Sequence, residues 1–222
     1  MRRWNGWGDE ATIYPLPDPA ARYLEDLAGP GCPSPDAPLE AVLAQVPPAH
    51  LPAHPLVSSD PLERLLHARG QSLPDWIALR SGQVGLFPDG VAYPESDADV
   101  RSLLDYAGAV GARLIPYGGG TSVVGHINPL PGEAPVLTVD LSRLDQLLDL
   151  DETSRLATFG AGVPGPRLEA MLERLREMAQ GITVLPEHGF QARTGHAGPK
   201  SRQPAGFIQV EKLVQATQVH RQ

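Results

Sequence analysis

The sequence has one cysteine, no long apolar run and no excess of basic residues. Cys32 has no second cysteine to pair with, so an internal disulfide is excluded, and a metal site would need other ligands. The apolar runs fall far short of the roughly 20 residues that cross a bilayer, so we expect no membrane span. The formal net charge of −8 argues against a nucleic-acid partner, which selects for a basic surface.

The amino terminus also lacks the apolar segment of a secretory signal. After two arginines, MRRWNGWGDE places Asn5, Gly6 and Gly8 where a signal peptide would be hydrophobic, so we expect a cytoplasmic protein. The charge is unevenly distributed along the chain. Residues 186–222 carry two acidic and five basic residues, which predicts an atypical basic tail, either frame-shifted or disordered.

Prolines are concentrated near the amino terminus, where residues 1–61 hold twelve of the 24. Because proline removes a backbone donor, only short helices fit there, at 20–27 and 38–46. A better helix is predicted over 60–70, with Asp60 as N-cap, Pro61 at the first helical position and Gly70 as the stop. We interpret residues 1–85 as a proline-rich arm that wraps a larger body.

The pattern over 86–185 changes to alternating strands and helices. A strand at 91–93 precedes a helix opened by a capping box of Ser96 and Asp99, and a second strand at 113–117 runs into a glycine loop. These elements form a βαβ unit if the two strands pair in parallel. We predict further strands at 136–141, 155–159 and 182–185, a turn or short helix at 144–150, and a helix at 167–178. The predicted apolar faces of the two longer helices are Val100, Leu103, Leu104, Ala107 and Val110, and Leu168, Met171, Leu172, Leu175 and Met178.

The loop IPYGGGTSVVGH, residues 115–126, has three consecutive glycines followed by two hydroxyl side chains. Consecutive glycines can point several N–H groups into one concavity, which suits a phosphate. The loop fails the GxGxxG spacing because Val123 stands at the third glycine position, and it lacks the lysine of a nucleotide-hydrolase loop. From the loop alone, a connection without a ligand remains an alternative.

The sequence segments on both sides of this loop resemble those of a known family. The run PDGVAYPESDADVRSLLDYAGAVGARLIPYGGGTSVVGH, followed by VLTVDLSRLDQLLDLDETSRLATFGAGV, resembles the FAD-binding domain of the FAD-linked oxidases of the vanillyl-alcohol oxidase type. MRRWNGWGDE and RLLHARGQSLPDWIALRSG resemble one branch, the alkyldihydroxyacetonephosphate synthase-like flavoproteins. The resemblance covers about residues 1–178.

The resemblance implies a cofactor, a site and a fold. The cofactor is FAD, and its pyrophosphate is cradled by the residues that match the family's PxGGGTS motif, namely Pro116, Tyr117, Gly118, Gly119, Gly120, Thr121 and Ser122. The implied fold class is α+β, a PCMH-type FAD-binding domain of two small subdomains with FAD between them, here with the second one incomplete. In the family a substrate domain follows, so a small-molecule substrate is expected for a full-length form.

The chain departs from the family after residue 178. The family continues with an STxGG-type segment, whereas this sequence reads EHGFQARTGHAGPKSRQPAGFIQVEKLVQATQVHRQ. We therefore expect a truncated or frame-shifted product, and we place no catalytic acid, base or nucleophile in it. Three hypotheses follow: the FAD-binding portion of a flavin-dependent oxidoreductase or alkyl-transfer enzyme, a non-catalytic fragment, and a stand-alone phosphate-binding module.

Other residues are interpreted as structural. His126 is expected to make a local hydrogen bond rather than a covalent flavin link, and no metal site is expected from the histidines of the tail, His188, His196 and His220. The acids at 149, 151 and 152 are assigned to a solvated turn between strands. The three tryptophans, Trp4, Trp7 and Trp76, are expected to anchor the arm, and Arg64, Arg69 and Arg80 to pair at the surface with acids such as Glu63 and Asp75.

Overall fold

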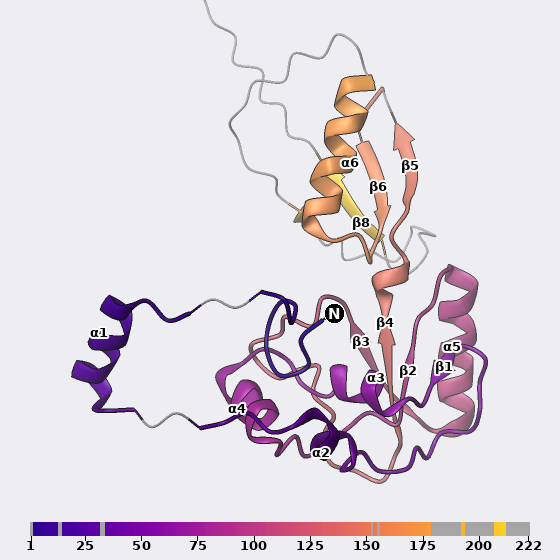
Figure 1. Cartoon of the computed structure of the whole chain (residues 1–222). Coiled ribbons are helices and arrows are strands. Elements are labelled where there is room, and N and C mark those ends of the chain that lie inside the picture. Colours follow the sequence, from indigo (N-terminus) through magenta and orange to yellow (C-terminus); the bar gives the residue numbers. More distant parts are fainter. Residues whose placement is uncertain are drawn as a thin grey trace, which may run out of the picture. The chain divides into compact units, whose positions relative to one another are not determined.

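The computed structural model describes residues 2–12, 15–31, 34–151, 153–154 and 156–178, and the backbone of two short strands at 192–193 and 207–211. The chain divides into two compact units, Met1–Ala92 with Tyr106–Val139, and Tyr93–Asp105 with Asp140–Gln222. Each unit is an α/β assembly with its own four-stranded sheet (Figure 1). Among the described residues, no helix is long and apolar enough to cross a membrane.

The sheet of the first unit has the order β1-β2-β4-β3. Its strands are β1 (Val57–Ser58), β2 (Gly90–Ala92), β3 (Arg113–Tyr117) and β4 (Val136–Asp140), with β2 antiparallel to β1 and parallel to β4. The strands at 91–93 and 113–117 do not pair with each other, because β4 lies between them, so the condition set for a βαβ unit of adjacent strands is not met. All five residues of β4 are buried, as expected for a strand covered on both faces in the middle of a sheet.

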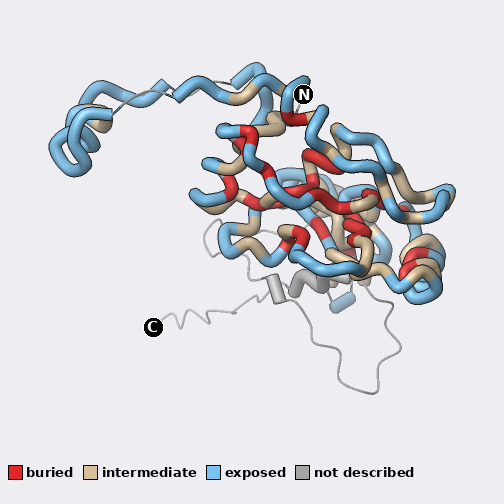
Figure 2. The backbone as a smooth tube through the Cα atoms, turned by 90° about the horizontal axis from the view of Figure 1, so that it is seen from below, coloured by how far each residue is buried: buried red, intermediate tan, exposed pale blue. Residues whose placement is uncertain are grey.

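The proline-rich residues of this unit pack around a core of their own. Helices α2 (Leu39–Leu43), α3 (Pro61–Leu66) and α4 (Leu73–Ser81) surround it. Its buried members are Val42, Leu65, Ala68, Leu79, Val84 and Phe87. Helix α1 (Asp18–Ala28) has no buried residue and is exposed except at Ala20 and Ala21, which are intermediate (Figure 2).

The caps read from the sequence are present. The Asp60 carboxylate accepts hydrogen bonds from the N–H groups of Leu62 (2.9 Å) and Glu63 (3.0 Å) and so opens α3. The Asp99 N–H donates to Ser96 Oγ (3.2 Å) at the start of α5 (Asp97–Val110). Gly70 is not the helix stop that was predicted, because α3 already ends at Leu66. On α5, Leu103 and Ala107 are buried as expected, but Leu104 is 51% exposed.

In the second unit, helix α6 (Gly165–Met178) packs against an antiparallel sheet. After a 3₁₀ turn, η1 (Leu141–Arg143), the sheet runs β5-β6-β8-β7, formed by β5 (Leu147–Asp151), β6 (Leu156–Gly160), β7 (Ala192–Arg193) and β8 (Phe207–Glu211). Helix α6 packs Leu168, Met171, Leu172 and Leu175 against Ala157 and Phe159.

Two predictions in this unit have different outcomes. The turn or helix expected at 144–150 is wrong, because most of that stretch is strand β5, paired with β6. A short leucine-rich run fits a helix and a strand equally well, and here the pairing with β6 selects the strand. The strand predicted at 182–185 and the side chain of Met178 lie outside the described residues, as do Cys32 and the tail histidines.

Candidate functional site at the glycine loop

The glycine loop begins where β3 ends, at a buried tyrosine. Tyr117 is 1% exposed; its hydroxyl donates to the Leu66 carbonyl (3.2 Å) and accepts a hydrogen bond from Arg2. Its ring lies 4.4 Å from the ring of His67. The side chain of Tyr117 thus anchors the end of β3 to the segment after α3 and fixes where the loop starts.

The three consecutive glycines are not equivalent. Gly120 has φ +69°, and a Cβ there would clash with the Tyr117 hydroxyl and lie 2.7 Å from Arg2 Nη2, so the fold itself requires glycine. Gly118 and Gly119 are exposed. A Cβ on Gly118 would meet nothing within 4 Å, and one on Gly119 would meet only Thr121 Cγ2, at 3.8 Å. The protein does not need glycine at these two positions, so their bare backbone is available to a ligand.

The backbone N–H groups of the loop are also available. Within the part of the chain that the structure describes, no hydrogen bond outside the sheet uses the N–H of Gly119, Gly120 or Thr121. Glycine-rich turns with free N–H groups bind anions because the N–H dipoles converge. The guanidinium of Arg2 lies 5.5 Å from the centre of the Tyr117 ring and adds a positive charge beside the loop.

The second half of the loop is held by hydrogen bonds. Ser122 Oγ and His126 Nδ1 are 3.1 Å apart, which confirms the local hydrogen bond expected for His126. The Ser122 carbonyl accepts from the Gln71 N–H (2.6 Å), and the Asn128 N–H donates to the Gly125 carbonyl (3.0 Å). Segments 70–72 and 128 therefore fix the loop at Ser122 and Gly125.

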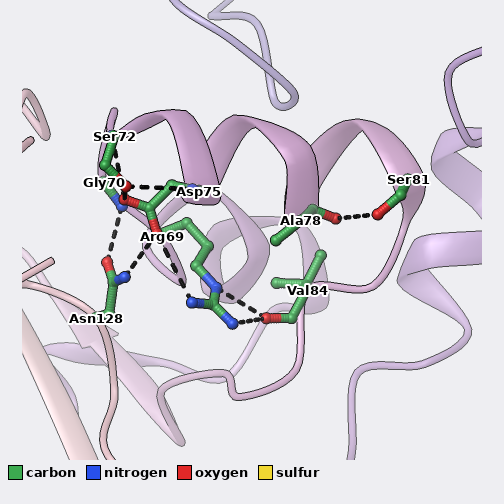
Figure 3. A network of polar contacts seen from close by, with 8 residues as sticks. All are labelled: Arg69, Gly70, Ser72, Asp75, Ala78, Ser81, Val84 and Asn128. Atoms are coloured by element: carbon green, nitrogen blue, oxygen red, sulfur yellow. Dashed lines mark hydrogen bonds and ion pairs between the residues drawn. The ribbon is translucent and has the colours of Figure 1, made fainter.

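The buried carboxylate of Asp75 contacts Asn128 and Ser72 (Figure 3). Asp75 is 2% exposed and accepts from Asn128 Nδ2 (2.6 Å) and from Ser72 Oγ (2.5 Å). Asn128 Oδ1 in turn accepts from the Gly70 N–H (2.9 Å). Residues 72–75 read S-x-x-D, a capping-box pattern that is visible in the sequence, but the link from Asp75 to Asn128 leaves no local signal.

The arginines proposed for surface pairing have different roles. Arg64 is buried and donates to the carbonyls of Pro88 and Pro47, both at 2.6 Å, so the surface prediction is wrong for it. Arg69 donates to the Val84 carbonyl and lies 3.7 Å from Asp75. Arg80 pairs at the surface, but with Asp36 (2.6 Å).

The remaining candidates are also structural. Asp149 and Asp151 lie on strand β5, not in a turn as predicted, and Glu152 is outside the described residues. Hydrogen bonds from the Ser154 side chain and N–H lower the pKa of Asp151, with a smaller contribution from Thr153. Across the described ranges, no group of histidine, cysteine, aspartate or glutamate side chains could hold a metal ion.

Of the tryptophans, only Trp4 packs against the core cluster of the first unit. Trp7 is 73% exposed, against the expectation that it anchors the arm. Trp76 donates from Nε1 to Gln71 Oε1 (2.6 Å), at the edge of the segment that contacts the loop.

Comparison with known proteins identifies a similar domain family. The sequence model of the FAD-binding domain family matches residues 88–185. The chain is 29% identical to an alkyldihydroxyacetonephosphate synthase of Dictyostelium discoideum over 82% of its own length and 35% of that protein. It is 28% identical to the protein of the same name from Trypanosoma brucei brucei over 78% of this chain and 33% of that one.

A solved structure supports the same relationship. An alkyldihydroxyacetonephosphate synthase, 27% identical, superimposes with a TM-score of 0.68 over 78% of this chain and 37% of that one. The chain thus spans about a third of the length of the relatives that it matches. Residues 88–185 match the FAD-binding domain family, and about four fifths of the chain is similar to alkyldihydroxyacetonephosphate synthases.

Proposed function

We propose that this chain binds FAD and that the loop Gly118–Ser122 receives the cofactor's pyrophosphate. The observation that carries the proposal is the contrast among the glycines. Gly120 is required by its own packing, whereas Gly118 and Gly119 are exposed and a Cβ on either would meet no clash. A ligand that approaches the backbone closely gives these two positions a reason to be glycine.

The residues present fit a pyrophosphate. The N–H groups of Gly119, Gly120 and Thr121 and the Thr121 hydroxyl are donors on an exposed loop, and Arg2 supplies positive charge next to it. Bound FAD supplies the redox or electron-sink chemistry in enzymes of this kind. The part of this chain is to bind the cofactor and hold it in one orientation.

We further propose that the chain acts as the FAD-binding portion of a flavin-dependent enzyme of the alkyldihydroxyacetonephosphate synthase-like type, with a small-molecule substrate. The similarity over about four fifths of the chain supports this assignment. A flavin-dependent dehydrogenase is the related alternative, since the mitochondrial D-lactate dehydrogenase [cytochrome] of Kluyveromyces lactis is 34% identical over 38% of the chain.

The experiment is an FAD titration of the purified chain, followed by flavin absorbance and fluorescence, with two glycine variants. Gly119→Leu places a side chain where the pyrophosphate is proposed to lie. Gly31→Leu is the matched control, because Gly31 is also exposed with nothing within 4 Å of a Cβ and no positive φ. Neither change creates a clash, so both variants should keep the melting temperature of the parent.

The expected result is FAD binding by the parent and by Gly31→Leu, and a loss of at least about tenfold in affinity for Gly119→Leu, which corresponds to about 1.4 kcal/mol. Equal affinity in all three proteins refutes the loop assignment. Binding of inorganic pyrophosphate or ADP without FAD would instead identify a phosphate-binding module. Binding of neither would identify a fragment without flavoprotein function.

A further inference from the structure

The contacts of Asp75 exceed what its helix needs. As the third residue of α4, it forms a capping box in which the Ser72 N–H donates to Asp75 Oδ2 (3.1 Å) and the Asp75 N–H donates to Ser72 Oγ (3.2 Å). Those bonds complete the cap. The other oxygen, Oδ1, accepts from Asn128 Nδ2 at 2.6 Å, a residue 53 positions further along the chain.

Asn128 connects Asp75 to the glycine loop. Its Oδ1 accepts from the Gly70 N–H (2.9 Å), and its own N–H donates to the Gly125 carbonyl (3.0 Å). Because Nδ2 donates to Asp75, the amide orientation that offers Oδ1 to Gly70 is fixed. The buried carboxylate of Asp75 thus orients the Asn128 side chain. Asn128 in turn contacts the loop at Gly125 and the neighbouring segment at Gly70.

The segment formed by Gly70 and Gln71 holds the loop at a second point, the carbonyl of Ser122. The Gln71 N–H donates to the Ser122 carbonyl at 2.6 Å, and a Cβ on Gly70 would clash with that same carbonyl oxygen. Gly70 is therefore a close-approach glycine under the loop. With the carbonyls of Ser122 and Gly125 held, the stretch Gly119–Thr121 between Tyr117 and Ser122 is fixed at both ends.

We propose that Asp75 is a positioning residue for the glycine loop, which it holds through Asn128 in the conformation that receives a phosphate group. A loop ordered in advance loses less conformational entropy when it binds, so its affinity is higher. The ligand part of this proposal rests on the proposed function. The contacts from Asp75 through Asn128 to the loop, here called the clamp, involve the protein alone. They can be tested without FAD.

Exchange of the two side chains gives a sharp test. Asp75→Asn leaves one acceptor oxygen in place of two, so its NH₂ group opposes either Asn128 Nδ2 or the Ser72 N–H. Asn128→Asp puts two carboxylates against each other. Each single change therefore disrupts the contacts that Asp75 makes. The double variant D75N/N128D restores one donor and one acceptor with the roles reversed, and it still offers oxygens to Ser72 and Gly70. Asp60→Asn is the structural control, since Asp60 also caps a helix but does not contact the loop.

Three quantities are measured on the full chain: FAD affinity, melting temperature without FAD, and amide hydrogen exchange at Gln71 and Asn128 without FAD. Both single variants should bind FAD about tenfold more weakly, the scale of effect when a group that orients direct ligands is lost. Their Gln71 and Asn128 amides should exchange faster. The double variant should recover both properties, and Asp60→Asn should change neither beyond its effect on melting temperature.

Two outcomes overturn the proposal. One is unchanged exchange and affinity in both single variants. The other is a loss in Asp75→Asn that equals the loss in Asp60→Asn at the same change in melting temperature, which indicates a role in stability alone. If the parent binds no FAD, the proposed function fails, and the exchange rates at Gln71 and Asn128 still decide whether the clamp exists.

Discussion

The Tyr117 hydroxyl leaves no room for a side chain at Gly120. The bare Cα of Gly120, at φ +69°, lies against the Tyr117 hydroxyl, which is itself bonded to Leu66 and Arg2. This pair explains why the third glycine of the run is glycine before any ligand is considered. It gives no reason for glycine at Gly118 and Gly119.

We predict that Gly120→Ala destabilises the protein by about 2 kcal/mol or more, since left-handed strain costs about 1–2 kcal/mol and overpacking about 1–3 kcal/mol. Urea unfolding measures the loss. Gly118→Ala, with nothing near its Cβ, should leave the unfolding free energy unchanged. Equal unfolding free energies for Gly120→Ala and Gly118→Ala would contradict the packing argument.

Asp89 makes the stability of the first unit depend on pH. Burial raises the pKa of its carboxyl, but hydrogen bonds from the Val136 N–H and from the side chain and N–H of His50 outweigh burial and lower the pKa below 3.8. The Val136 N–H to Asp89 Oδ2 distance is 2.8 Å. A depressed pKa means that the folded state favours the charged form, so this stabilisation is complete above pH 3.8 and is lost as the pH falls through the folded pKa.

Asp89→Asn should therefore reduce the unfolding free energy at pH 7 and flatten its decline below about pH 4. Denaturant unfolding at several pH values from 7 to 2 measures both effects. The comparison variant is Asp18→Asn, at an exposed position in α1. If parent and Asp89→Asn lose stability in parallel below pH 4, Asp89 is not responsible for the acid sensitivity.

Among the elements, α1 differs from the other helices in contributing nothing to a core. Its residues Tyr23, Leu24 and Leu27 are 65%, 47% and 71% exposed. Changing all three to glutamine should alter the unfolding free energy by no more than about 0.5 kcal/mol, the usual range for surface positions. Thermal melting measures this, and Leu172→Ala on α6, which packs against the core of its unit, is the contrasting change. A large loss from the α1 variant would mean that α1 packs against the protein in solution.

The elements also show how far local patterns predict structure. The caps at Asp60 and Ser96 are confirmed because a capping residue acts within three or four positions of itself. Strand β5 was missed because a short leucine-rich run fits helix and strand equally, and its pairing with β6 selects the strand. The place of β4 between β2 and β3 could not be read from local patterns, because it depends on pairing between strands that are distant in the chain.

For the protein as a whole, FAD should stabilise the unit that contains the loop. At a free concentration one hundred times Kd, we expect about 2.7 kcal/mol of added stability from binding to the folded state alone. Calorimetry with increasing FAD measures the rise in melting temperature, and amide exchange should slow at Gly119, Gly120 and Thr121. Riboflavin, which has no phosphate, is the control ligand. Equal stabilisation by riboflavin would place the binding energy away from the pyrophosphate.

Local sequence determined helices α5 and α6, the caps at Asp60 and Ser96, the strand that feeds the loop and the match to FAD-binding domains, because each depends on residues close together in the chain. Helix α4 (Leu73–Ser81) was not predicted. Only the tertiary structure decided which glycine the fold needs, that Arg64 is buried, and that Asp75 reaches the loop through Asn128. The reason is distance along the chain. A contact between residues 53 positions apart leaves no periodicity or spacing in the sequence, and the folded backbone alone brings its two ends together.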